Sequence, residues 1–90
     1  MTGERVLQLR ADRVSWSELD EEVVILDLDT SRYLRLNETG ALLWKELQTP
    51  ATVEQLHHRL LDAYDVDEEE ARAGVASFIT QLEEYGLLLS

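Results

Sequence analysis

The side chains with catalytic or metal-binding chemistry are few and poorly spaced for it. His57 and His58 are adjacent, so on a helix they point about 100° apart and cannot chelate one ion together. Asp27 and Asp29 share one face of an expected strand, but no third ligand or base accompanies them. We therefore expect both aspartates to face solvent, and we expect no metal, no cofactor and no catalytic residue.

Other catalytic and targeting motifs are also missing from the sequence. It contains no cysteine, its four glycines are scattered rather than grouped in a phosphate-binding loop, and no serine stands in a nucleophile elbow. The N-terminus lacks the basic-then-apolar pattern of a secretory signal, and no apolar run approaches the ~20 residues of a membrane span. We expect a cytoplasmic protein that is not an enzyme and has no membrane partner.

Size and charge favour recognition at a surface. The 90 residues, 44% of them apolar, support one domain spanning residues 1–90, and a deep pocket would consume much of so small a core. The formal net charge of −11 repels a nucleic-acid backbone and attracts a basic peptide or protein. An acidic face that merely keeps the protein soluble explains the same charge equally well.

The first half of the chain has the patterns of a three-stranded antiparallel sheet within about residues 14–36. Residues 14–17 and 32–36 alternate apolar with polar side chains, and residues 23–28 are mostly β-branched and apolar. The short polar segments between these runs predict tight turns and antiparallel pairing. Residues 5–10 are a candidate for a further short strand.

The second half has the patterns of three helices within about residues 38–86. Asn37 is a suitable N-cap for the first helix, Thr52 begins a capping box for the second, and Asp67 does the same for the third. Gly86 is the expected C-terminal stop of the third helix. We therefore predict an α+β, winged-helix-like fold in which an N-terminal three-stranded sheet precedes three helices.

The strand at residues 32–36 is the best candidate for a binding element, because an open edge accepts an extended peptide as an additional strand. Leu34 and Leu36 should face one side and Tyr33 and Arg35 the other. If the N–H of Leu34 faces the open edge, proline at that position should impair peptide binding. The candidate peptide-binding residues, on this strand and the third helix, are Arg32, Tyr33, Leu34, Arg35, Leu36, Val75, Phe78, Ile79 and Leu82.

Both groups of candidates have simpler explanations. Arg32 and Arg35 are also suited to protecting an edge strand against aggregation. The apolar helix positions among them are also what a hydrophobic core requires. Which face of strand 32–36 would meet a peptide stays open at this stage.

The segment Val23–Trp44, VVILDLDTSRYLRLNETGALLW, resembles the family of the pyrroloquinoline quinone biosynthesis protein D. It is most similar to the stand-alone leader-recognition proteins of lasso-peptide gene clusters, and the similarity extends over about residues 12–90. The matching features are an apolar strand with Leu-Asp, a turn, an aromatic residue in the next strand, and Leu-Asn-Glu before the first helix. The turn at residues 29–31 lacks the glycine that relatives have there.

This resemblance implies a recognition element for ribosomally made, post-translationally modified peptides. In that family the leader region of the precursor peptide adds as a strand to the third strand of the sheet and packs against the third helix. Here those elements correspond to residues 32–36 and 67–85. The implied partners are the leader region of a precursor peptide, a separate cysteine-protease-like leader peptidase and a later macrolactam-forming cyclase.

Two other functions are compatible with the same predicted elements. A winged-helix nucleic-acid-binding or regulatory domain has three helices and a hairpin, but here the third helix would begin with four acidic residues where a DNA reader needs phosphate contacts. A dimerisation subunit without a peptide ligand is the other alternative.

Overall fold

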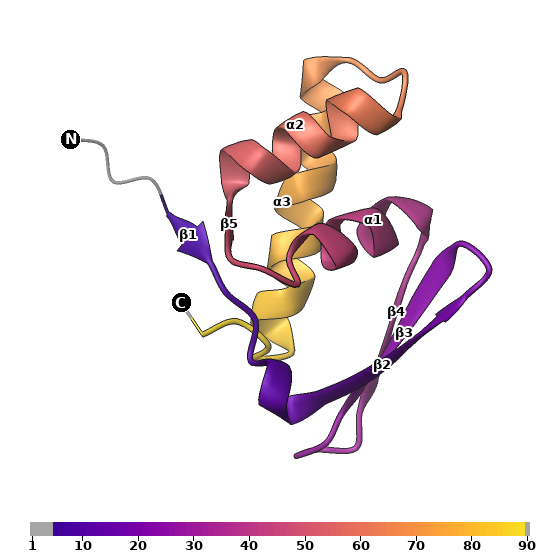
Figure 1. Cartoon of the computed structure of the whole chain (residues 1–90), viewed down its shortest axis with the longest axis vertical. Coiled ribbons are helices and arrows are strands. Elements are labelled where there is room, and N and C mark those ends of the chain that lie inside the picture. The colour runs from indigo at the N-terminus through magenta and orange to yellow at the C-terminus, as the bar shows by residue number, and fades with distance from the viewer. Residues whose placement is uncertain (1–4, 90) are drawn as a thin grey trace.

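A computed structural model of the chain, described here for residues 5–89, places three helices on one side of a small antiparallel sheet, with α1 packed directly against the sheet (Figure 1). The elements in chain order are β1 (Val6–Leu7), a 3-10 turn (Ala11–Arg13), β2 (Val14–Leu19), β3 (Glu22–Asp27), β4 (Tyr33–Leu36), α1 (Glu38–Glu46), β5 (Ala51–Thr52), α2 (Val53–Ala63) and α3 (Glu68–Glu84). This is the predicted α+β, winged-helix-like fold, with its sheet and its three helices in the predicted order.

The three-stranded sheet has the order β2-β3-β4, and all of its pairs are antiparallel. Leu34 and Leu36 of β4 are buried on the helix side, whereas Tyr33 and Arg35 are exposed on the other side. The predicted alternation along this strand is therefore confirmed. The face of the sheet that carries Tyr33 is left uncovered by the helices (Figure 1).

Each helix begins at the residue that the sequence predicts. The side chain of Asn37 accepts the N–H of Gly40 at 2.9 Å. Thr52 forms a reciprocal capping box at the start of α2. Asp67 caps α3, and the chain leaves that helix at Gly86, whose φ of +67° suits glycine.

The sequence did not predict how the N-terminal segment pairs. β1 lies within the expected region of residues 5–10, but it pairs with β5, a two-residue strand that no pattern in the sequence predicts. Beyond β1, Leu9 pairs with Leu88, so the N-terminal segment also lies against the chain that follows α3. These contacts tie both ends of the described chain to the helical layer.

The hydrophobic core lies between the sheet and the helices. Trp44 of α1 is fully buried at its centre and meets Trp16 of β2 edge to face, with ring centroids 6.0 Å apart. The core residues of α3 include Val75, Phe78 and Leu82. A core shared by every helix and the sheet fixes where α3 lies relative to β4, and that placement forms the site described next.

One prediction about the sheet was wrong. Asp27, expected to face solvent, is only 2% exposed, because it closes the β3–β4 hairpin from the inside. Its Oδ1 accepts the backbone N–H of Asp29 at 2.9 Å, and Thr30 donates further hydrogen bonds to the same carboxylate. The carboxylate therefore organises the turn that leads into β4. Asp29 itself is exposed and pairs with Arg13 at 2.7 Å.

Candidate functional site

The edge of the sheet at β4 is open along the described chain, because β3 is the only strand that pairs with it there. One hydrogen bond at the hairpin end shows which backbone groups of β4 point toward β3 and which point away from it. There the Asp27 N–H donates to the Arg32 carbonyl at 2.8 Å. In an antiparallel ladder, hydrogen-bonded pairs alternate with non-hydrogen-bonded pairs. In the β3–β4 register, Leu34 and Leu36 therefore point their backbone groups at β3.

The backbone N–H and C=O groups of Tyr33 and Arg35 consequently point away from β3, toward the open edge. A second hydrogen bond agrees with this assignment. The N–H of Leu28 donates to the carbonyl of Arg13, on the side of β3 away from β4. The N–H of Leu34 does not face the open edge, so the condition attached to the proline prediction at that residue is not met. The edge offers two donors and two acceptors within β4.

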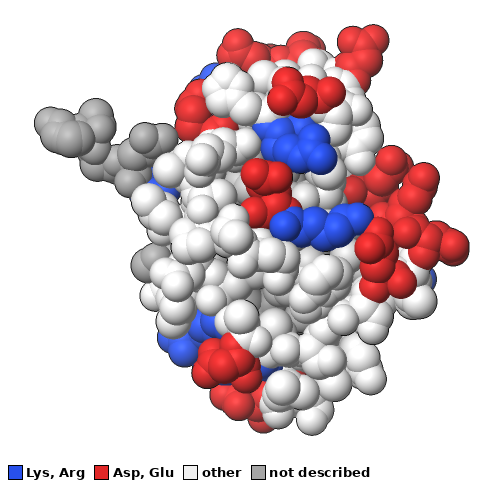
Figure 2. All heavy atoms as spheres, in the orientation of Figure 1, with Lys and Arg blue, Asp and Glu red and all other residues white. Residues whose placement is uncertain are grey.

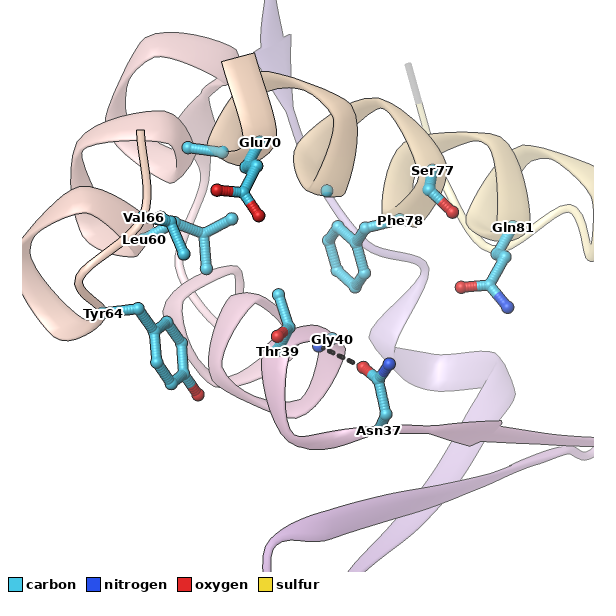
Figure 3. Close-up of a pocket in the computed structure, with 12 residues that line it drawn as sticks. Asn37, Thr39, Gly40, Leu60, Tyr64, Val66, Glu70, Ser77, Phe78 and Gln81 are labelled. Carbon is cyan, nitrogen blue, oxygen red and sulfur yellow. Dashed lines mark hydrogen bonds between the residues drawn. The ribbon is translucent and has the colours of Figure 1, made fainter. Parts of the chain in front are cut away.

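The open edge lies next to a pocket of about 360 Å³ whose longest wall is α3. Figure 3 shows Asn37, at the end of β4, across the pocket from Ser77 and Gln81 of α3, with the ring of Phe78 pointing into the pocket beside them. The lining residues are Asn37, Thr39, Gly40, Leu60, Tyr64, Val66, Glu70, Ala71, Gly74, Ser77, Phe78 and Gln81. We call this pocket and the open edge of β4 the groove.

The opposite end of the groove is closed by a contact between β4 and α3. The guanidinium of Arg32, just before β4, lies 4.2 Å from the ring centroid of Tyr85, which ends α3. Such a cation–π contact at an exposed site contributes about 0.5–1 kcal/mol. Because Arg32 lies near the end of α3 and Asn37 lies near its middle, β4 and α3 run past each other in opposite directions.

The groove combines an apolar floor with polar groups at its margin. Leu60, Val66 and Phe78 provide apolar surface, and Ser77 and Gln81 provide hydrogen-bonding groups. Tyr64 also lines the groove; burial raises the pKa of its hydroxyl, and the charge of Glu38 and a hydrogen bond to Glu38 raise that pKa further. A tyrosine hydroxyl is protonated at neutral pH even without this shift, and here it is hydrogen-bonded to Glu38.

The structure separates the nine candidate residues into different surroundings. Those of strand 32–36 lie together beside the groove, with Leu34 and Leu36 buried. Of the four candidates on α3, only Phe78 lines the groove. It is 2% exposed, so its ring is also part of the core. Val75 and Ile79 line a second pocket of about 370 Å³ toward α2, and Leu82 is fully buried.

Sequence reasoning therefore missed most of the groove-lining face of α3. That face carries Glu70, Gly74, Ser77 and Gln81. These residues are polar or small, so they have the pattern of an ordinary solvent-exposed helix face. A glycine in the middle of a helix was the one usable signal, because it marks a close approach of another element. A Cβ on Gly74 would lie 3.3 Å from a methyl group of Leu60.

Residues 5–89 contain neither a cluster of metal ligands nor a membrane-spanning helix. No group of three His, Cys, Asp or Glu side chains in this range is arranged to hold a metal ion. Within the same range, no helix has both the length and the apolar character that crossing a membrane requires.

Comparison with known proteins gives one family and two close structural neighbours. The model of the family described as coenzyme PQQ synthesis protein D (PqqD) matches residues 22–88. A comparison with curated protein sequences gives no match.

Both structural neighbours were solved with a leader peptide bound. One is TbiB1 in complex with the TbiA(beta) leader peptide, with 26% identity, a TM-score of 0.80, and coverage of 92% of this chain and 95% of that chain. The other is a lasso peptide synthetase B1 complexed with the leader peptide, with 28% identity, a TM-score of 0.75, and coverage of 93% and 98%.

Proposed function

Because this chain belongs to the family of coenzyme PQQ synthesis protein D, we propose that it captures the leader region of a ribosomally made precursor peptide. The leader adds as a fourth strand to the open edge of β4 and lies along α3. The role is one of binding, and the chemical steps belong to partner enzymes. The observation that carries the proposal is the open β4 edge beside an apolar pocket, in a chain similar to two leader-bound proteins.

The geometry of β4 supports one way of holding such a leader. Its backbone pairs with the N–H and C=O groups of Tyr33 and Arg35, which supplies affinity without regard to sequence. Every second leader side chain then falls on the side of Leu34 and Leu36 and points toward the pocket with Phe78 at its floor. The other leader side chains share the outer face of the sheet with Tyr33.

A direct titration tests the proposal. The probe is a fluorescein-labelled leader peptide of the precursor encoded in the same gene cluster, and its anisotropy is followed as the protein is added. Saturable binding is the expected result. The control peptide carries proline at alternate positions of the pairing segment, which removes backbone donors and should weaken binding. A wild-type protein that binds neither peptide contradicts the proposed function.

A matched pair of variants at Arg35 tests the mode of binding. Arg35→Pro removes an N–H that faces the open edge and leaves the β3–β4 ladder intact, whereas Arg35→Ala removes only the side chain. The ion pair lost in both variants, from Arg35 to Glu22 at 2.8 Å, is exposed and contributes little. Arg35→Pro should weaken binding about fivefold or more relative to Arg35→Ala, because an unpaired leader carbonyl costs about 1–3 kcal/mol. Equal affinities of the two variants, with equal melting temperatures, contradict strand addition.

We further propose that the captured leader is presented to a separate cysteine-protease-like leader peptidase, and that a macrolactam-forming cyclase acts on the peptide afterwards. Holding the leader on a protein that also contacts the peptidase raises the local concentration of the cleavage site and requires no catalytic residue here. The uncovered face of the sheet supports such a contact. Its exposed or half-buried apolar residues are Leu19, Val24, Leu26, Leu28 and Tyr33.

A further inference from the structure

The two ends of the groove carry opposite charges. At one end, the Arg32 guanidinium is stacked on Tyr85, and no acidic side chain of residues 5–89 forms an ion pair with it. The hydrogen bond from Arg32 to the hydroxyl of Thr30 uses the backbone N–H and does not involve the guanidinium. This end of the groove therefore presents an uncompensated positive charge directly beside the edge to which a peptide adds.

At the other end, Glu70 is the only charged side chain among the residues that line the pocket. Its backbone N–H is bonded to the Asp67 carboxylate, but its own carboxylate forms no ion pair within the described chain. The neighbouring surface strengthens this charge, because acidic side chains gather over the α2–α3 end of the molecule (Figure 2). A cationic side chain is therefore favoured there.

The distance between the two ends sets the spacing of the charges that would match them. Glu70 and Tyr85 are fifteen positions apart on α3, which at ~1.5 Å per residue corresponds to about 22 Å along the helix. An extended peptide advances by ~3.3 Å per residue, so about seven residues of leader cover that distance.

We propose that the groove selects leaders by a pair of opposite charges about six or seven residues apart, an acidic residue meeting Arg32 and a basic residue meeting Glu70. This inference builds on the proposed leader binding and concerns which leaders are accepted. The order of the two charges along the leader also shows whether the leader runs parallel or antiparallel to β4. A leader antiparallel to β4 carries the basic residue nearer its own N-terminus, and a parallel leader carries the acidic residue there.

A charge scan of the same cluster-encoded leader tests this inference. Each position of the pairing segment is replaced in turn by Glu and by Lys, and the dissociation constants of the two peptides are compared on wild-type protein. At one position Glu should bind more tightly than Lys, and six or seven positions away Lys should bind more tightly than Glu. The preference at each end should be about fivefold, the upper range for an exposed ion pair.

Charge-reversal variants assign each preference to its residue. Arg32→Glu should reverse the preference at the first position only, and Glu70→Lys should reverse it at the second position only. Arg72→Glu and Glu69→Lys are the matched controls, since both change charge equally on α3, but Arg72 lines the second pocket and Glu69 does not line the groove pocket. Both controls should leave the two preferences in place.

The outcomes separate the inference from the function on which it depends. Tight binding of a leader with equal Glu and Lys affinities at every position overturns the charge-pair inference and leaves leader capture intact. Reversal by the control variants as strongly as by Arg32→Glu and Glu70→Lys also overturns it, because the effect is then one of total charge. Failure of wild-type protein to bind any of the peptides counts against leader capture itself.

Discussion

At the scale of single residues, Asp27 links the sheet to the groove. Burial alone would raise the pKa of its carboxyl group, but hydrogen bonds from Asp29 and Thr30 and the charge of Arg13 outweigh burial and hold the pKa below the ordinary value of 3.8. The ionised carboxylate is thus stabilised in the folded protein. Because it holds the turn that precedes β4, the same residue fixes where the open edge begins.

The lowered pKa of Asp27 predicts how the stability of the protein changes with pH. A folded-state pKa below the unfolded value contributes stability that is present above about pH 3.8 and is lost as the pH falls through the folded pKa. Asp27→Asn should therefore lower the melting temperature at pH 7, and its difference from wild type should narrow toward pH 3. Thermal melts followed by circular dichroism across this range measure both effects.

Asp29→Asn is the control for this experiment, because it removes an exposed carboxylate two residues away and leaves the buried one unchanged. Its difference from wild type should not follow the same acid-dependent course. A constant gap between Asp27→Asn and wild type from pH 7 to pH 3 would show that hydrogen-bond geometry, and not the charge of Asp27, stabilises the turn.

At the scale of elements, the sequence predicts more of the fold than of the groove. The strands and helices were predictable because alternation and capping are local signals: Leu34 and Leu36 are buried as their spacing predicts, and Asn37 caps α1. The pairing of β1 with β5 was not predictable, because it joins two-residue segments far apart in the chain.

Two features could not be predicted from the sequence: which backbone groups of β4 point toward the open edge, and which face of α3 lines the groove. Which N–H groups point outward depends on which residue pairs of the β3–β4 ladder are hydrogen-bonded, and side-chain alternation alone does not reveal that. α3 is contacted on several sides, so its apolar residues mark the core and not the groove. Phe78 illustrates this point: it lines the groove, but its 2% exposure means that its truncation tests folding first.

The face of α3 that meets the leader is tested by two tryptophan substitutions. Ser77 and Ala76 are adjacent, exposed residues, yet Ser77 lines the groove and Ala76 lines the second pocket. Ser77→Trp should fill the groove and weaken leader binding by about tenfold or more, equivalent to ~1.4 kcal/mol. Ala76→Trp should bind normally, and both should keep the stability of wild type to within about 0.5 kcal/mol. Anisotropy titrations and thermal melts on the same preparations give both quantities, and a stronger loss in Ala76→Trp would place the leader in the second pocket.

At the scale of the whole molecule, two different surfaces are available at once. A leader bound in the proposed way adds at the β4 edge beside α3, and every second leader side chain then lies on the outer face of the sheet. The helices leave that outer face uncovered (Figure 1). Tyr33, 66% exposed, lies where the two surfaces meet. A partner that contacts the outer face would therefore touch this protein and the bound leader together.

The proposed presentation to a peptidase should therefore depend on the outer face independently of leader affinity. Leu26 lies at the centre of that face, between Ser15 of β2 and Tyr33 of β4. Leu26→Glu places a carboxylate in the proposed apolar contact, where an unpaired buried charge costs several kcal/mol. Leader affinity should stay within about twofold of wild type, while cleavage of the leader-bound precursor by the cluster's peptidase should slow by about tenfold or more.

Val53→Glu is the matched control, because Val53 is an exposed apolar residue that borders the second pocket. It is the first residue of α2, where a negative charge suits the helix dipole, so the substitution should preserve the fold. Cleavage is followed by mass spectrometry at protein concentrations that saturate the leader, so that weakened capture does not imitate weakened presentation. If Val53→Glu slows cleavage and Leu26→Glu does not, the peptidase docks at the second pocket, and the outer face of the sheet has another role.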